Sequence, residues 1–143
     1  MLLKYFKSFL NTNTAPHLAL PFEKSYLCNF QATIMETFAQ QWKKVEDFLR
    51  VRFGKTPDME AVLYLIGINE LGDPGRDFTK EQKQDLMHIA VCKLLSQAGY
   101  FALESHDAEG WPHYTPLKPV PANGLGEQEQ LLKEQIIAYF NLP

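Results

Sequence analysis

The sequence has few cysteines and no long apolar run, and these two absences set the first limits. Cys28 and Cys92 are far apart and outside any CxxC pattern, which excludes a disulfide scaffold and predicts free thiols in a reducing cytoplasm. The longest apolar run, residues 61–68, is far shorter than the roughly 20 residues of a membrane span. We therefore expect a soluble, cytoplasmic protein.

The sequence also lacks common catalytic signatures and an excess of positive charge. It has no glycine-rich phosphate loop, no GxSxG and no HExxH motif. Lys and Arg number 14 against 17 Asp and Glu, a formal net charge of -3, which excludes a strongly basic nucleic-acid-binding protein.

The charge is unevenly distributed along the chain. Residues 1–56 hold eight Lys and Arg against four Asp and Glu, whereas residues 57–143 hold six against thirteen. Such asymmetry indicates either a basic patch for an acidic partner or two halves of one fold that attract each other. Both interpretations stay open at the level of sequence.

Helical periodicity dominates what is present. Hydrophobic residues make up 45% of the chain, enough for one core. The first predicted helix ends at Gly54. A second helix is expected to run from an N-cap at Thr56 to Leu71. A capping box of Thr79 with Gln82 begins a third helix, which runs to Ala98. The apolar stripe of the first helix consists of Phe38, Trp42, Val45, Leu49 and Phe53. A last helix near the C-terminus is predicted from a second stripe: Leu132, Ile136, Tyr139 and Phe140.

A β-hairpin is predicted at about residues 100–117, with a turn at 107–110. Four prolines in and after its second strand restrict that strand to the edge of a sheet. In the expected register, His106 pairs with Trp111, Glu104 faces His113 and Leu103 faces Tyr114. Phe101, Leu103 and Tyr114 then form the buried face.

These elements predict a mainly α fold: a compact bundle of three to five helices with one appended antiparallel β-hairpin. We expect a single domain over residues 35–143. Residues 1–34 differ from the rest and are interpreted as an N-terminal extension, either loosely attached or produced from an upstream start, since Met35 stands where a shorter domain begins.

The third predicted helix carries a candidate metal or catalytic pair. At 100° per residue, Asp85, His88 and Cys92 share the face opposite the core stripe. His88 and Cys92 are i, i+4 neighbours and both are zinc ligand types, while an imidazole beside a thiol also suits nucleophilic catalysis. A structural zinc site needs four ligands, and the sequence offers no second pair, so an ordinary exposed face is the competing interpretation.

The hairpin supplies the candidate interaction surface: Trp111, His113, Glu104 and His106. Trp111 is a typical anchor side chain in protein interfaces, or it covers the core. The other three are candidates for a metal or proton-relay role, or for a simple cross-strand ion pair of Glu104 with His113. At the end of the second helix, Glu70 either meets a group on the third helix or lies at an exposed helix end.

Three segments within residues 38–140 carry a resemblance: Leu63-Tyr64-Leu65-Ile66-Gly67, Asp85-Leu86-Met87-His88-Ile89-Ala90 and Glu109-Gly110-Trp111-Pro112-His113. In these segments the chain resembles a small uncharacterised bacterial protein family. The resemblance implies no activity, cofactor or catalytic residue.

The sequence therefore favours a non-enzymatic protein-protein interaction or self-associating module, with a protein partner or a homodimer and without a cofactor. Two alternatives remain. The order of three helices, a hairpin and a helix resembles a winged-helix regulator, although Glu81 and Asp85 on the third helix would repel phosphate, so a nucleic-acid partner is not expected. A small-ligand or metal-binding protein is the other alternative.

Overall fold

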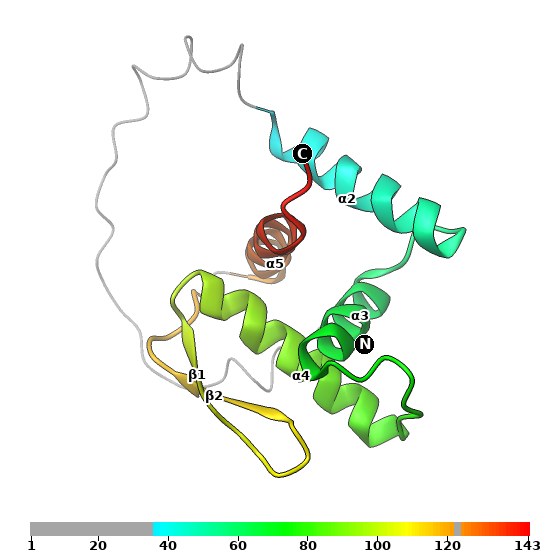
Figure 1. The fold of residues 1–143 in the computed structure, drawn as a ribbon. Helices are drawn as coiled ribbons and strands as arrows, with labels where there is room; N and C mark the ends of the chain where they lie inside the picture. The colour runs from blue at the N-terminus through cyan, green and yellow to red at the C-terminus, as the bar shows by residue number, and fades with distance from the viewer. Residues whose placement is uncertain (1–35, 122–123) are drawn as a thin grey trace.

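The computed structural model describes residues 36–121 and 124–143 (Figure 1). In chain order the described elements are α2 (Phe38–Phe53), α3 (Met59–Leu71), α4 (Lys80–Gln97), β1 (Phe101–His106), β2 (Pro112–Pro116) and α5 (Leu125–Phe140). The predicted mainly α fold with an appended β-hairpin is thus confirmed. The predicted extension, residues 1–34, lies outside the described residues.

The most extensive helix contact is between α3 and α4, which cross at the centre of the molecule (Figure 1). Their backbones approach closely at Gly67, where a Cβ atom would lie 2.2 Å from the backbone oxygen of Leu86. A residue without a side chain is required at such an approach. The buried core cluster draws on all the described helices and β1: Val45, Leu49, Val62, Leu63, Ile66, Ala90, Val91, Cys92, Leu94, Leu95, Phe101, Leu132 and Ile136.

Two of the helices begin with the same capping motif. Thr79 and Gln82 form the predicted capping box of α4, and Thr37 and Gln40 form an equivalent box at α2. The N-cap predicted for α3 at Thr56 is wrong. The side chain of Asp58 accepts the backbone N–H of Ala61 at 2.8 Å instead, because an aspartate two residues later offers the same acceptor.

The hairpin packs against α4, with Leu103 opposite Tyr114 as predicted. Beyond that pair, an irregularity between Leu103 and Ser105 shifts the register by one residue, so Ser105 rather than Glu104 pairs with His113. The predicted facing of Glu104 and His113 is therefore wrong. Residue spacing alone does not reveal where one strand holds an extra residue.

Two other expectations for the hairpin are also wrong. His106 pairs with Pro112, so its predicted pairing with Trp111 is wrong. The buried face is also smaller than predicted: Phe101 is buried, but Leu103 is 51% exposed because the hairpin extends beyond the surface that covers its base. Among the described helices, none is long and apolar enough to cross a membrane.

The first described helix occupies a peripheral position. α2 packs chiefly against α5, and Figure 1 shows it apart from the hairpin. Val45 and Leu49 are buried in this contact, and Phe48 meets Phe140 with ring centroids 5.8 Å apart. α2 is thus joined to the core by a single stripe, which leaves the rest of its circumference at the surface.

Candidate functional site

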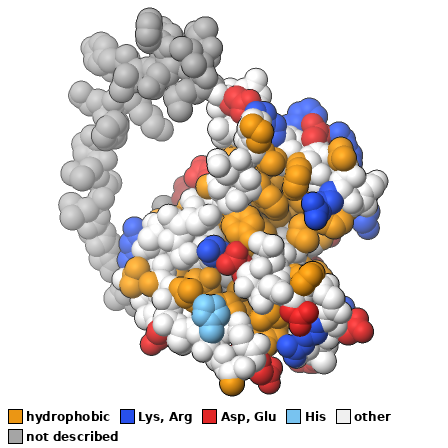
Figure 2. Space-filling model, in the orientation of Figure 1, with side chains coloured by type: hydrophobic (Ala, Val, Ile, Leu, Met, Phe, Trp, Pro, Cys, Tyr) orange, Lys and Arg blue, Asp and Glu red, His pale blue; other side chains and the backbone are white. Residues whose placement is uncertain are grey.

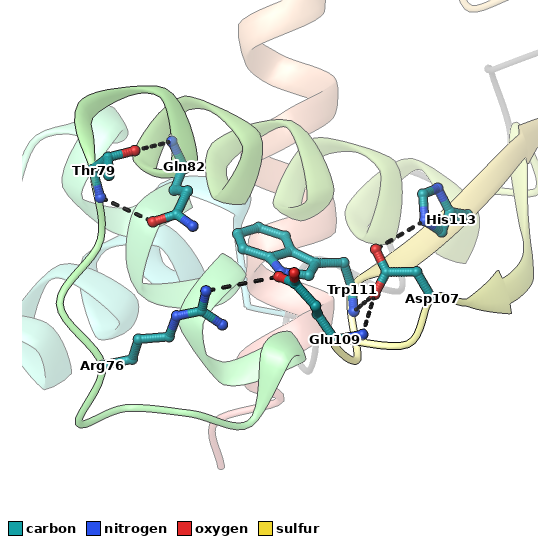
Figure 3. Close-up of polar contacts among 7 residues, drawn as sticks. All are labelled: Arg76, Thr79, Gln82, Asp107, Glu109, Trp111 and His113. Carbon is teal, nitrogen blue, oxygen red and sulfur yellow. Dashed lines mark hydrogen bonds and ion pairs between the residues drawn. The ribbon is translucent and has the colours of Figure 1, made fainter.

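Trp111 lies at the tip of the hairpin and contacts the connection between α3 and α4. Its ring stands edge-on to Phe78, with centroids 6.3 Å apart, and the guanidinium of Arg76 lies 5.9 Å from its centroid. Arg76 also forms an ion pair with Glu109 at 3.8 Å (Figure 3). The half-buried indole thus joins the tip to the helical core, so only part of this predicted anchor is open to a partner.

The turn beside Trp111 is organised by Asp107. One carboxylate oxygen accepts the backbone N–H groups of Glu109 and Trp111, each at 2.9 Å, and the other lies 3.4 Å from Nε2 of His113 (Figure 3). The hydrogen bond from the Trp111 backbone, with those from Glu109 and His113, lowers the pKa of Asp107. His113 therefore faces the turn aspartate, a partner that the sequence register did not identify.

The remaining members of the predicted interaction surface are exposed but do not converge. Glu104 accepts a hydrogen bond from the hydroxyl of Thr115 at 2.5 Å. His106 is exposed at the end of β1. The structure thus places Glu104 and His113 on separate polar partners, and the hairpin surface stays a prediction.

The predicted pair on α4 is divided between two environments. His88 is exposed, whereas Cys92 is 2% exposed and belongs to the core, so its predicted position on the solvent face is wrong. Burial raises the pKa of the Cys92 thiol to about 12. The His88 ring reaches the surface but is partly desolvated by its neighbours, which lowers its pKa against the charge of Asp85. The core around α4 is wider than a single stripe because α3, α5 and the hairpin all pack on it.

The burial of Cys92 argues against both roles considered for His88 and Cys92, which are nucleophilic catalysis and metal binding. A thiol held neutral is a poor nucleophile and a poor metal ligand, since both roles require the thiolate. Within residues 36–121 and 124–143, no group of three or more His, Cys, Asp or Glu side chains is arranged to hold a metal ion. Metal binding by His88 and Cys92 therefore gains no further ligand from this part of the chain.

Glu70 lies at the junction of three helices. Its carboxylate is 3.4 Å from Nζ of Lys93 on α4 and accepts the hydroxyl of Tyr139 on α5 at 2.8 Å. Asn69 donates to the same hydroxyl at 2.5 Å. Burial and the bond to Glu70 raise the pKa of Tyr139 to about 12. The predicted contact of Glu70 with the third predicted helix is confirmed, and the alternative, that Glu70 simply lies at an exposed helix end, is wrong. Through these contacts the cluster connects α5 to α3 and α4.

A different surface, which sequence reasoning missed, lies on α2 beside its contact with α5. Val51 is 86% exposed and Phe48 is 38% exposed. Phe48, Val51 and Arg52 stand at i, i+3 and i+4, so they share one helix face, and Lys55 follows just beyond Gly54. We call Phe48, Val51, Arg52 and Lys55 the α2 surface. The signal in the sequence was Val51, an apolar residue outside the predicted stripe and between two arginines.

Comparison with known proteins assigns no role to the α2 surface. No protein-family model, curated protein or solved structure matches the chain at a significant level. The resemblance to a small bacterial family accordingly stays a prediction.

The charge around α4 bears on nucleic-acid binding. Glu81 and Asp85 are exposed on the helix that would enter a groove in a winged-helix protein, and the hairpin tip carries Asp107 and Glu109. These carboxylates would repel phosphate. Five of the eleven Lys and Arg side chains of the described residues lie on or just after α2, and three lie on α4 itself: Lys80, Lys83 and Lys93.

Proposed function

We propose that the protein is a protein-protein interaction module and that a partner binds at the α2 surface. The observation that supports this is the 86% exposure of Val51 beside the partly exposed ring of Phe48. A single exposed apolar residue is ordinary, but an aliphatic and an aromatic side chain adjacent on one helix face offer area that a partner can cover.

The position of α2 also supports this function. Its buried stripe packs on α5, whereas Val51 and part of the Phe48 ring stay exposed beside that contact, so a partner can cover them without displacing any described element. An aromatic ring flanked by a cationic side chain is typical of the residues that contribute most to binding at interfaces. The hairpin residues Trp111 and His113 form a second, weaker candidate surface because both are engaged within the molecule.

Site-specific cross-linking tests the proposal. A photoreactive amino acid in place of Val51 should give a defined adduct when cells of the source organism are irradiated. The matched control carries the same amino acid in place of Glu81, which is exposed on α4. An adduct from position 51 that is missing from position 81 supports the proposal. No adduct from position 51, or equal adducts from both positions, would contradict it.

A further inference from the structure

We infer that the partner segment is acidic and apolar: a stretch of another protein that places an apolar side chain on Phe48 and Val51 and carboxylates beside Arg52 and Lys55. This inference rests on the proposed function and specifies the chemistry of its partner.

Most charges on α2 are already neutralised within the molecule. Lys43 lies 3.0 Å from Asp47, which also pairs with Arg50, and Lys44 lies 2.7 Å from Glu36. These pairs leave little net charge on their side of the helix.

Arg52 and Lys55 differ from these paired cations. Neither has an ion-pair partner among residues 36–121 and 124–143, and both are exposed. They flank the apolar pair, one on the same helix face and one just past the helix end. Figure 2 shows Lys and Arg side chains interleaved with hydrophobic ones in the region of α2. Cations beside apolar area are complementary to carboxylates beside apolar area.

The rest of the chain directs an acidic partner to this place. Residues 57–143 hold six Lys and Arg against thirteen Asp and Glu, so an acidic segment is repelled by most of the remaining surface. For the uneven charge in the sequence, the inference favours a basic patch for an acidic partner, one of the two interpretations left open above.

Two other occupants fit this surface less well. A second copy bound symmetrically through Val51 would bring Arg52 of each chain close to the other, which opposes association. A membrane-bound amphipathic helix inserts its broad apolar face, but Val45 and Leu49 on that face are 1% exposed because they pack on the core. An acidic protein segment satisfies both the charge and the limited apolar area.

The test uses the photoreactive amino acid at position 51 in the full chain. One variant of this protein also carries Arg52→Glu with Lys55→Glu. A second variant, the charge-matched control, carries Lys80→Glu with Lys83→Glu on the exposed start of α4. We expect the first pair to lower the adduct yield about tenfold and the control pair to leave it unchanged. Sequencing the cross-linked peptide should identify an acidic segment. Circular dichroism of each variant verifies that it is folded.

Each contrary result has a distinct meaning. An adduct that is insensitive to charge reversal, or a cross-linked peptide without acidic residues, overturns this inference and leaves the proposed function standing. An adduct of twice the chain mass shows a second copy instead and also overturns it. If the protein binds vesicles of anionic phospholipid and the Arg52→Glu, Lys55→Glu variant does not, the surface binds lipid, and this result also overturns the inference. Absence of any adduct is the failure of the proposed function itself.

Discussion

The α3–α4 pair and α2 have helices of similar length but very different surroundings. α4 is buried along most of its length by α3, α5 and the hairpin, whereas α2 buries Val45 and Leu49 in a contact made chiefly with α5. The two regions differ in the number of elements that pack on each helix. Helices in proteins gain most of their stability from such packing.

The difference suggests a division of roles. We expect the α3–α4 pair to contribute most of the free energy of folding. Its polar groups, such as Glu70 with Lys93 and Tyr139, are engaged in contacts between helices. α2 is fixed by one stripe and leaves Val51 free for recognition. Segments with few packing neighbours are also those that open most readily. Four predictions test this comparison, in order of expected effect.

Truncation of one buried leucine in each region should have the largest effect. Leu94 is 0% exposed on α4 and Leu49 is 1% exposed on α2. Leu94→Ala should lower the free energy of unfolding by about 4 kcal/mol, because α3, α5 and the hairpin all pack on α4 and limit how far the site can collapse. Leu49→Ala should cost about 2 kcal/mol and act mainly on α2. Hydrogen exchange should show α2 amides exchanging faster in Leu49→Ala while the slowest α4 amides are retained. Equal loss of protection in α4 would contradict the division.

A single added methyl group should have the next largest effect. In Gly67→Ala the new Cβ would meet the Leu86 backbone oxygen at 2.2 Å, so the helices must separate, and we expect a loss of about 3 kcal/mol. Gly126→Ala on α5 is the control, since nothing lies within 4 Å of its Cβ position. The control should be neutral or stabilising by about 0.5–1 kcal/mol. Urea denaturation measures both, and an unchanged midpoint for Gly67→Ala would refute the close approach.

Alkaline pH should weaken the core through Cys92. Its pKa is raised from an ordinary value of 9.0 to about 12, so the folded state holds the thiol proton more tightly than the unfolded state. The thiol's contribution is fully present below pH 9 and is lost as pH rises toward 12, at up to about 1.4 kcal/mol per pH unit.

The measurement is the free energy of unfolding between pH 8 and 10 in a Cys28→Ser background. The range ends at pH 10 because the pKa values of Tyr114 and Tyr139 are raised from 10.0 to about 12, so these tyrosines lose their own contribution mainly above the ordinary value of 10.0. Adding Cys92→Ala should flatten the decline above pH 9. If the two profiles keep the same slope, the thiol is not the buried group that titrates.

The matched capping boxes provide the smallest and most direct comparison. Thr37→Ala and Thr79→Ala each remove a side-chain acceptor for a backbone N–H three residues ahead, at a cost of about 1 kcal/mol. We expect Thr79→Ala to lower global stability by that amount, because α4 unfolds only with the core. Thr37→Ala should instead increase exchange in the first turn of α2 with little change in the global midpoint. The reverse pattern would place α2 inside the cooperative unit.

The sequence predicted the elements well and the surfaces poorly. The capping box at Thr79, the glycine that ends α2 and the hairpin turn depend on neighbouring residues, so local patterns were enough. The position of Cys92 was predicted wrongly because burial depends on how many elements surround a helix. The strand register failed at one irregular residue. Val51 stood outside the predicted apolar stripe in the sequence, but how far it is exposed depends on the neighbours of α2.

By itself, the sequence determined a mainly α fold with an edge hairpin, since periodicity, caps and prolines act over a few residues. Tertiary structure alone decided that Cys92 is buried, that Glu70 joins three helices and that Val51 stands exposed beside Phe48 and Arg52. The physical reason is that burial and charge pairing are set by contacts between residues distant in the chain, which no local pattern encodes.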